Sequence, residues 1–491
     1  MSTAPRTFAD FILHHALTRP EKPAIILADR VATYDMMAQG MLRVEERIRA
    51  LNLAPHELVC IAIESPIRHM IVAAALFRLG HPIMSVGKAS DIGPFKLPVN
   101  IVLQGAPESL IPGWRQIVVG DDWFTGDRRS TARDPSNGFE GDQSICRVDF
   151  SSGTTGRPKV LSLTVKACHE WIRNYYSSIG LGTWDRVLIL PGLTSSWGFT
   201  MAAHALAAGR TMLRATTPRD SLQMISVYGA DALVASSQQL RELVREQMQA
   251  SIPCSTLRVT MTGGGMISDS LMLQARANLC GSIVNQYGSS EAGLTAYTMA
   301  GQLPETEGAT GYVVPGAEVE IVDESSNRLP PGTDGIIRIR ANWQAQPFPP
   351  GGESDFDDGW FYPGYRGRLT VDGLLILSGR TSEVINAGGF KLAPDVIEEI
   401  LLGHPNVADA GAFGSMGASG IEEIYIAIVP RTPLSEQHIV AWCAERNVPV
   451  TGVFLVETLP KTALGKIQRG ELKRLLMQGQ PVGRAGGRDR T

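Results

Sequence analysis

The stretch DFSSGTTGRPKVL, residues 149–161, is the segment from which the rest of the sequence is best interpreted. Between Ser151 and Arg157 it supplies two serines, two glycines and two threonines, and a proline and a lysine follow directly. Such a run offers no apolar side chains to a core, and its residues are poor helix formers. The strand-like segment ICRVDF, residues 145–150, leads straight into it. The sequence therefore predicts a loop at the end of a β-strand.

The composition of this loop suits the binding of an anion. Backbone N–H groups of a glycine-rich loop form a concavity for anions, hydroxyl groups add donors, and Lys159 adds a positive charge. The loop is not a Walker P-loop, because G-x-x-x-x-G-K-[ST] cannot be fitted onto GTTGRPK. A flexible surface turn is the alternative interpretation for any run of Gly, Ser and Thr. Taken alone, the loop is a candidate phosphate site.

The composition of the whole chain is that of an ordinary globular protein. Its 491 residues predict two to four structural units at roughly 150 residues per domain. A hydrophobic content of 44% and a charged content of 19% are typical of soluble proteins with a large core. The net charge of −4 gives no reason to expect nucleic acid or an anionic membrane as a partner. The longest apolar run, residues 70–77, is too short to span a bilayer.

The N-terminus and the cysteines favour a cytoplasmic location. The first twenty residues contain an acidic residue and paired histidines where a signal peptide needs an apolar segment. The six cysteines include no CxxC pair, so a reducing compartment fits and a disulfide framework does not. The nine histidines show no spacing typical of metal ligands. We therefore expect a soluble cytoplasmic protein.

The pattern of apolar runs predicts an α/β protein over the first two-thirds of the chain. Short β-rich runs alternate with helical patterns, which indicates parallel sheets covered by helices. Strands are expected at residues 22–27, 30–34, 57–65, 185–190, 229–236, 256–264 and 281–288, and helices at 7–17, 67–79 and 237–250.

From Gly316 onward the pattern changes. Residues 317–323, 335–340 and 373–380 alternate between apolar and polar side chains, as antiparallel strands do. Residues 382–477 predict a small α+β unit, with a helix at 395–405 and a strand at 423–430. The end of the chain is rich in Gly and Arg, and we expect disorder over residues 478–491.

Further motifs follow the opening loop in a fixed order. They are NQYGSSEAG (285–293), DGWFYPGYRGRLTVDGLLILSGR (358–380) followed by INAGGFKLAP (385–394), and LPKTALGKIQRGEL (459–472). With the loop, these motifs resemble the adenylate-forming family of acyl- and aryl-CoA synthetases, carrier-protein adenylation domains and luciferases. The family pattern is close to S-G-T-T-G-x-P-K, Y-G-x-T-E, W-x-x-T-G-D, G-R-x-x-x-I and P-K-T-x-x-G-K-I-x-R. The resemblance covers nearly the whole chain.

The resemblance implies a two-domain architecture. Residues 1–380 would form a large N-terminal domain that binds AMP and the acyl group, built of parallel-rich sheets with helices and a small distorted β-barrel. Residues 381–477 would form a small, mobile α+β domain that acts as a catalytic lid. The disordered tail of residues 478–491 would follow.

The resemblance also implies a reaction in two steps. A carboxylic acid attacks the α-phosphate of ATP to give an acyl-adenylate, and the acyl group then passes to the thiol of CoA with release of AMP. The first step brings one anion against another, and two unit charges 4 Å apart repel by about 4 kcal/mol at an effective dielectric constant near 20. By resemblance, Lys466 is the cation that bridges the carboxylate and the α-phosphate. Fixed charges aimed at the reacting centre are the expected main source of rate.

The matched motifs carry over the remaining site residues. Glu291 would hold Mg²⁺, a hard cation suited to oxygen ligands, Tyr287 would lie against adenine, and Arg380 would contact the ribose or phosphate. Thr155 joins Lys466 and Glu291 in the catalytic set. The nucleotide site as a whole would comprise Ser151, Ser152, Gly153, Thr154, Thr155, Gly156, Lys159, Gly264, Gly265, Met266, Gln286, Tyr287, Gly288, Ser289, Ser290 and Arg380. The implied cofactors are ATP, Mg²⁺ and CoA.

The second half-reaction of the family uses a rotation of the small domain. The hinge position falls on Ser382, where aspartate or lysine is more usual. After the rotation, a loop containing Gly388, Gly389 and Lys391 would line a tunnel for the pantetheine thiol, and its glycines allow a close approach of the backbone.

The sequence departs from the family pattern at several positions. Pro363 and Tyr365 stand where the T-G-D element has its threonine and its ribose-binding aspartate, and a tyrosine cannot provide a charged bidentate acceptor. Thr194 stands near the position of a common histidine, and Val160 replaces a usual glycine. Because Lys466 and the phosphate loop remain, we expect a working enzyme. A degenerate member that binds a ligand without turnover is the alternative.

The acyl substrate is less clearly indicated. Residues 193–198, LTSSWG, lack the aspartate that binds the ammonium group in amino-acid-activating relatives, which argues against an α-amino acid. Ser196, Trp197 and Gly263 are the candidate acyl-pocket residues, and plain core packing is the alternative for Trp197. The small glycines leave room for an aryl or medium-length acid. CoA is the expected acceptor, and the phosphopantetheine arm of a carrier protein is the alternative.

Overall fold

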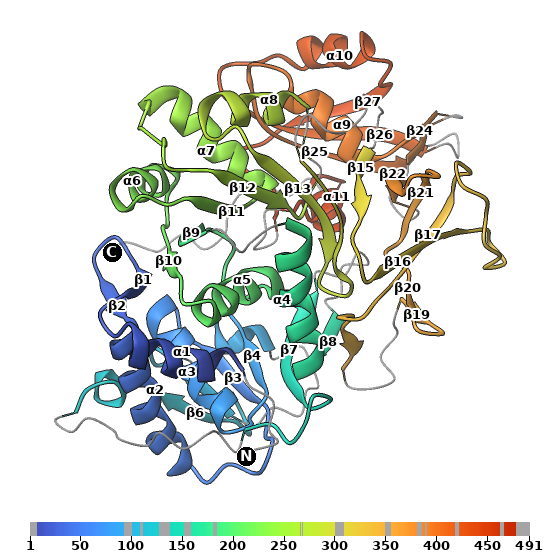
Figure 1. Ribbon diagram of the computed structural model, residues 1–491. Coiled ribbons are helices and arrows are strands. Elements are labelled where there is room, and N and C mark those ends of the chain that lie inside the picture. Colours follow the sequence, from blue (N-terminus) through green and yellow to red (C-terminus); the bar gives the residue numbers. More distant parts are fainter. Residues whose placement is uncertain are drawn as a thin grey trace.

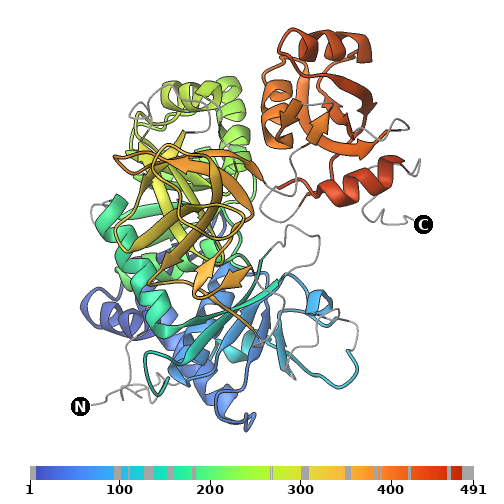
Figure 2. The same cartoon turned by 90° about the vertical axis from the view of Figure 1, so that its right-hand side faces the viewer.

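The structure is a computed structural model and contains two large sheets with helices, followed by a smaller C-terminal lobe (Figures 1 and 2). It describes residues 7–92, 101–108, 111–126, 138–151, 159–179, 184–265, 267, 269–299, 309–348, 355–380, 385–387, 390–417, 422–461 and 466–477. Helices α9 and α10 lie at the top of Figure 1, and the orange-to-red C-terminal lobe lies at the upper right of Figure 2.

The first large sheet has seven strands in the order β18-β8-β7-β4-β3-β5-β6. Its central strands are parallel, whereas β8 runs antiparallel to β7 and β18 antiparallel to β8. The strand bounds are β3 Val59–Ala62, β4 Ile83–Ser85, β5 Ile101–Gln104, β6 Arg115–Val118, β7 Ile145–Ser151, β8 Lys159–Thr164 and β18 Gln346–Pro347. The opening loop is thus the connection of the β7–β8 hairpin.

The second large sheet begins with a parallel half in the order β13-β12-β11-β9-β10-β1, and the antiparallel β2 lies at its edge. Its strands are β1 Pro23–Ile26, β2 Val31–Thr33, β9 Arg186–Ile189, β10 Thr211–Leu213, β11 Ala232–Ser236, β12 Val259–Gly263 and β13 Ile283–Ser289. Both faces are covered, since Val187 and Ile189 enter one core while Leu188 enters another. Burial on both faces explains why these strands are continuous apolar runs.

Helices occupy the two cores beside the parallel strands. Residues of α1 (Phe8–Thr18), α2 (Tyr34–Arg49), α3 (Pro66–Arg78), α4 (Val165–Ile179) and α5 (Ser196–Ala207) share the first core with strands of both sheets. Helices α6 (Pro218–Tyr228), α7 (Ser237–Ala250) and α8 (Asp269–Asn278) cover the opposite face. Two short 3₁₀ helices, η1 (Ala89–Ile92) and η2 (Asp121–Trp123), lie near the first sheet.

The second sheet continues into antiparallel strands from β14 onward. They are β14 Gly293–Met299, β15 Ala309–Val313, β16 Ala317–Val322, β17 Gly335–Ala341, β19 Phe356–Asp357, β20 Trp360–Phe361, β21 Tyr365–Leu369 and β22 Leu374–Arg380. A separate apolar cluster that includes Ile337, Phe361 and Leu375 packs among them. The small distorted β-barrel stays a prediction.

The C-terminal lobe has its own apolar cores. A hairpin of β23 (Ile385–Ala387) and β24 (Phe390–Leu392) precedes a three-stranded sheet of β25 (Val407–Met416), β26 (Glu422–Pro430) and β27 (Val450–Leu455). Helices α9 (Pro394–Leu402), α10 (Glu436–Ala444) and α11 (Arg469–Met477) pack on this sheet. Its mixture of antiparallel and parallel pairs is that of an α+β unit.

The α/β architecture predicted from the sequence is confirmed. The helix predicted over residues 237–250 is α7, and the predicted strand pair near the N-terminus is β1 with β2. The tail of residues 478–491 lies outside the described residues. Within the described part of the chain, no helix is long and apolar enough to cross a membrane.

Candidate active site

The phosphate-loop candidate is closed at its base by strand pairing. Ser151 at the end of β7 pairs in register with Lys159 at the start of β8. The Lys159 ammonium forms an ion pair with Asp355, a contact that sequence patterns could not predict because 196 positions separate the two residues. Ser152, Gly153, Thr154, Thr155 and Gly156 lie outside the described residues, and for Ser151 the structure describes the backbone alone.

A buried ion pair supports the strand that leads into this loop. The Arg147 Nε donates to Asp149 Oδ1 at 2.6 Å, and each side chain is only 1% exposed. The guanidinium also lies 3.8 Å from the centroid of the Phe199 ring, a cation–π contact, and one of its Nη atoms donates to the Ser195 carbonyl at 3.4 Å. The sequence signal for this pair was the presence of two opposite charges, two residues apart, in an otherwise apolar strand. Our interpretation of the sequence did not use this signal.

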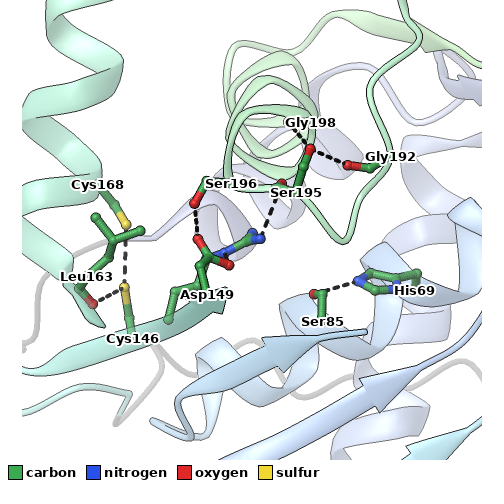
Figure 3. A network of polar contacts seen from close by, with 11 residues as sticks. His69, Ser85, Cys146, Asp149, Leu163, Cys168, Gly192, Ser195, Ser196 and Gly198 are labelled. Atoms are coloured by element: carbon green, nitrogen blue, oxygen red, sulfur yellow. Dashed lines mark hydrogen bonds and ion pairs between the residues drawn. The ribbon is translucent and has the colours of Figure 1, made fainter. Parts of the chain in front are cut away.

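The same carboxylate connects β7 with the start of α5. The Ser196 hydroxyl donates to Asp149 Oδ2 (Figure 3). Ser195 caps the helix, because its Oγ accepts from the Gly198 N–H at 3.0 Å and donates to the Gly192 carbonyl at 2.7 Å. The predicted acyl-pocket residue Ser196 is therefore held against the strand that carries the phosphate loop.

Two other parts of the network in Figure 3 flank this pair. The Cys146 thiol approaches the thiol of Cys168 at 3.6 Å, and His69 Nε2 lies 3.0 Å from the Ser85 hydroxyl. Burial lowers the pKa of His69 to about 4, so this imidazole is neutral at physiological pH. These groups pack around the network and add no charge to it.

The glycines at the end of β12 lie close to β13. A Cβ on Gly263 would come within 2.8 Å of the Gln286 carbonyl oxygen, so only glycine permits this approach. Gly264 has a φ of +82°, and the hydroxyl of Ser237, the first residue of α7, donates to the Gly265 carbonyl at 2.9 Å. Met266 lies outside the described residues.

The turn between β13 and β14 carries the aromatic and acidic candidates. Glu291 is 8% exposed, and its carbonyl accepts from the Ala345 N–H at 2.8 Å. Ser290 lies in this turn, and the Ser289 hydroxyl accepts from the Ala292 N–H at 3.1 Å. A Cβ on Gly288 would lie 2.3 Å from the Gly293 carbonyl oxygen. The turn is therefore compact, and its carboxylate is buried.

Tyr365, which stands in place of the expected aspartate, contacts a residue of the predicted adenine site. The rings of Tyr287 and Tyr365 meet edge to face, with centroids 6.2 Å apart and an interplanar angle of 85°. Arg380 lies opposite Tyr365 in the pairing of β21 with β22, although only its backbone is described. The residue that replaces the expected aspartate thus packs against the aromatic ring expected at adenine.

The segment that contains Lys466 is held at both ends. Lys461 and Ile467 form an isolated antiparallel bridge, and the Gln468 N–H donates to the Pro460 carbonyl at 2.8 Å. Lys461 also forms an ion pair with Asp409. Lys466 itself is half-buried.

An arginine–carboxylate cluster follows directly. Arg469 donates to both oxygens of Glu398, at 3.1 and 2.8 Å, and it also pairs with Asp395. The Ala412 N–H donates to Glu398 at 2.9 Å. Burial raises the pKa of Glu398 to about 7, although the Arg469 guanidinium acts in the opposite direction.

The remaining residues predicted for domain rotation are only partly visible. Ser382, Gly388 and Gly389 lie outside the described residues, and Lys391 lies on β24 with its backbone alone described. The C-terminal lobe contacts α7, where Arg245 donates to the Ala408 carbonyl at 3.0 Å. Among the described residues, no group of three or more His, Cys, Asp or Glu side chains could hold a metal ion without further ligands.

Comparison with known proteins gives two family matches. The model described as AMP-binding enzyme matches residues 113–347, and the model described as AMP-binding enzyme C-terminal domain matches residues 396–466. Together these ranges make up more than half of the chain.

Curated relatives act on several kinds of acid. An oxalate–CoA ligase of Arabidopsis thaliana is 30% identical over 340 residues, and the alignment spans 65% of this chain and 65% of that protein, just under two thirds of its length. A 3-hydroxybenzoate–CoA ligase of Aromatoleum is 26% identical over 95% of this chain and 89% of its own. A fatty acid–[acyl-carrier-protein] ligase of Streptomyces coeruleorubidus is 25% identical over 94% of either chain.

The fold recurs among solved structures. The o-succinylbenzoate CoA synthetase of Bacillus subtilis, solved with its acyl-adenylate intermediate, superposes with a TM-score of 0.82 at 22% identity. The match covers 94% of this chain and 98% of that one. At this identity the likeness concerns the fold.

Proposed function

The chain belongs to the AMP-binding enzyme family, and from this premise we propose that it converts a carboxylic acid to an acyl-adenylate with ATP and passes the acyl group to the thiol of CoA. The products would be acyl-CoA, AMP and pyrophosphate. The ligase names of the relatives support this reaction class. An aryl or medium-length acid is the proposed substrate.

The observation that carries this proposal is the set of groups at the ends of β7 and β13. Strand β7 leads into a loop rich in hydroxyl groups and glycines, and the cation Lys159 follows this loop. Strand β13 leads into a turn that contains a buried carboxylate, Glu291. Mg²⁺ is usually held by one or two carboxylates together with substrate phosphates, so a single Glu291 fits it. Bound there, Mg²⁺ would offset the charge of the phosphates.

We assign the reacting cation to Lys466. The bridge between Lys461 and Ile467 and the contacts of Arg469 would limit the freedom of the segment that carries it. A cation on a preorganised segment costs less reorganisation at the moment of reaction. Thr155, Arg380 and the other motif residues except Gln286 keep their proposed nucleotide roles.

The ribose contact would differ from the family pattern. Tyr365 can exchange one hydrogen bond, whereas an aspartate accepts two with charge assistance. We therefore expect weaker binding of ATP than an aspartate would give, and an adenine site whose aromatic wall is a pair of tyrosines.

The second half-reaction would use the two-domain organisation. We propose a boundary after residue 380, a lid of residues 381–477 that turns about Ser382, and a thiol path beside Gly388, Gly389 and Lys391. CoA is the proposed acceptor. The cysteine usage favours a reducing, cytoplasmic compartment.

A ligase that loads a carrier protein is the second candidate. The relative from Streptomyces acts on an acyl carrier protein and matches nearly the whole chain. Both acceptors present the same phosphopantetheine thiol, so the acyl-transfer chemistry would be unchanged. A thioester assay with CoA and with carrier proteins separates the two.

Carboxylate-dependent exchange of pyrophosphate into ATP tests the adenylation step. A panel of aryl, aliphatic and amino acids is assayed, and Lys466→Ala should reduce exchange by roughly a hundredfold or more. Exchange with some acids that Lys466→Ala abolishes would support the proposal. No exchange with any acid, in protein shown to be folded, would instead support a ligand-binding member that lacks turnover.

A further inference from the structure

Gln286 and Tyr287 are neighbours in the motif NQYGSSEAG, but their side chains serve different parts of the molecule. Successive side chains of a strand point to opposite faces of the sheet. Tyr287 packs with Tyr365 among the antiparallel strands. Gln286 is 8% exposed and contacts Tyr175, which belongs to α4. The glutamine predicted for the nucleotide site therefore lies on the side of α4.

The hydrogen bonds around Tyr175 orient the glutamine amide. The Tyr175 hydroxyl donates to Gln286 Oε1 at 3.2 Å. Burial raises the pKa of this hydroxyl, and the indole N–H groups of Trp171 and Trp197 lie near enough to act in the opposite direction. Because indole N–H groups can only donate, the phenol oxygen faces two donors and its own proton is directed to the amide oxygen.

This orientation leaves the amide nitrogen of Gln286 without an acceptor. Gln286 Nε2 is buried and forms no hydrogen bond with any described residue. Buried donors are normally satisfied, so this orphan donor calls for an acceptor supplied by a ligand.

A cavity begins beyond the Tyr175–Gln286 pair. It has a volume of about 230 Å³ and is lined by residues that include Ser178 and Ile179 of α4, Val284 of β13, and Tyr297 of β14. Tyr175 lies one helical turn before Ser178 and Ile179. Gln286 follows Val284 by two residues on the same face of β13, and it pairs across the sheet with Tyr297. The pair thus lies next to residues that line the cavity.

The other side of the pair belongs to the proposed acyl pocket. A Cβ on Gly263 would lie 3.4 Å from the Cβ of Gln286, and Trp197 adjoins the Tyr175 hydroxyl. Both were predicted from the sequence to line that pocket. The Tyr175–Gln286 pair therefore has neighbours among the predicted acyl-pocket residues and also among the residues that line the cavity.

We propose that Gln286 and Tyr175 form a polar end wall of the acyl pocket and select a short or aryl acid that carries an uncharged oxygen, a hydroxyl or keto group, to accept from Gln286 Nε2. This inference rests on the proposed function. The wall blocks long chains, and its buried amide disfavours a wholly apolar acid, which would leave the donor unpaired. Gln286 and Tyr175 are uncharged, as are the neighbouring Trp171 and Trp197, so a neutral oxygen suits this wall better than a second carboxylate.

The test compares matched acids in the pyrophosphate exchange assay with the full chain. Benzoate is compared with 3- and 4-hydroxybenzoate, and pentanoate with 4-oxopentanoate. A site that hydrogen-bonds a substrate oxygen discriminates strongly against the analogue without it, so kcat/KM should favour one oxygen-bearing acid by roughly tenfold or more. In Gln286→Met, which keeps the volume but removes the donor, this ratio should fall toward one.

A second variant tests the wall itself. Gln286→Ala should join the acyl pocket to the cavity and raise kcat/KM for decanoate relative to butanoate by roughly tenfold. Gln223→Met, the same substitution at an exposed position of α6, is the matched control and should change neither ratio. Circular dichroism and the unfolding midpoint establish that each variant is folded.

The outcomes separate this inference from the proposed function. Exchange without preference for an oxygen-bearing acid, or a preference that Gln286→Met retains, would overturn the inference and leave the ligase proposal standing. If no acid supports exchange, the binding of the same acids is followed by tryptophan fluorescence, since Trp171 and Trp197 flank the wall. Tighter binding of the oxygen-bearing acid, lost in Gln286→Met, would support the inference, and equal binding would overturn it.

Discussion

Two segments of this protein are each supported by an arginine–carboxylate contact, but the contacts differ in depth and in charge balance. Arg147 and Asp149, before the phosphate loop, are each 1% exposed and match one to one. Arg469, after Lys466, is 14% exposed and faces two carboxylates, Asp395 and Glu398. The second contact has a carboxylate in excess.

The difference indicates how each segment responds to its surroundings. A deeply buried one-to-one pair is costly to break from either side, because the remaining charge stays in the interior. A cluster with excess negative charge can gain a proton instead. Burial is the main cause of the raised pKa of Glu398, and the nearby Asp395 carboxylate adds to it. We therefore expect the strand before the phosphate loop to be rigid. The stability of the segment around Lys466 should instead depend on pH.

Removal of Asp149 should have the largest effect on stability. Asp149→Ala leaves the Arg147 guanidinium buried without its carboxylate, and the expected loss is about 3–5 kcal/mol in the free energy of unfolding. Urea denaturation measures this loss. The double variant Arg147→Met/Asp149→Leu removes both charges and should recover most of it. A loss in Asp149→Ala below about 1 kcal/mol would contradict a supporting role for the pair.

The contact of Arg469 with Asp395 and Glu398 should make the stability of the protein depend on pH. The pKa of Glu398 is raised from 4.5 to about 7, so the folded state holds its proton more tightly than the unfolded state. Its contribution to stability is fully present below pH 4.5 and is lost as the pH rises through 7, by up to roughly 3 kcal/mol.

Comparison of unfolding curves between pH 4.5 and 7 isolates this group. The stability of the wild type should fall relative to that of Glu398→Gln over this interval, because the glutamine cannot titrate. Glu436→Gln, at an exposed position of α10, is the control and should keep the slope of the wild type. Parallel curves for the wild type and Glu398→Gln would contradict a raised pKa of Glu398 in the folded state.

An acid in place of Tyr365, at the position expected to bind the ribose, should strengthen the binding of ATP. Tyr365→Asp replaces one neutral hydrogen bond with charge-assisted ones, and the KM for ATP should fall about tenfold. Loss of the contact with Tyr287 should reduce stability by about 0.5–1.5 kcal/mol. Tyr365→Phe keeps the ring but removes the hydroxyl, so it should raise the KM for ATP by roughly twofold to tenfold. A KM that does not fall in Tyr365→Asp would place the ribose away from Tyr365.

The smallest effect is expected at the exposed ion pair between Lys159 and Asp355. Asp355→Asn should change stability by less than about 1 kcal/mol, because exposed pairs contribute little. It should lower the KM for ATP by roughly twofold to threefold, since Lys159 would no longer share its charge with a carboxylate, and added salt should erase the difference. Asp357→Asn, another exposed acid nearby, serves as the control. An equal effect of both variants would show a general charge effect.

Much of the fold could be predicted from local patterns. The helix over residues 237–250 begins after a capping box of Ser236 and Gln239, which is a short-range signal. The buried strands were recognisable from continuous apolar runs. The boundary of the phosphate loop was equally local, since Ser151 and Lys159 are separated only by residues that favour turns.

The contacts that join distant parts of the chain could not be predicted in the same way. Asp149 binds Ser196 across 47 positions, and Tyr175 binds Gln286 across 111. We predicted Gln286 for the nucleotide site because Gln286 is next to Tyr287 in the motif. Successive side chains of a strand point to opposite faces, so the side chain of Gln286 lies on the face opposite to Tyr287 and contacts Tyr175.

The sequence by itself determined the order of the loops, the α/β class and the residue types available for phosphate, metal and carboxylate, because these depend on short-range propensities and on motifs. Only the tertiary structure decided which of those residues meet. It paired Lys159 with Asp355, set Tyr365 against Tyr287, and placed the Gln286 amide against Tyr175. The physical reason is that burial and hydrogen bonding are settled by neighbours in space, and here those neighbours come from strands and helices far apart in the chain.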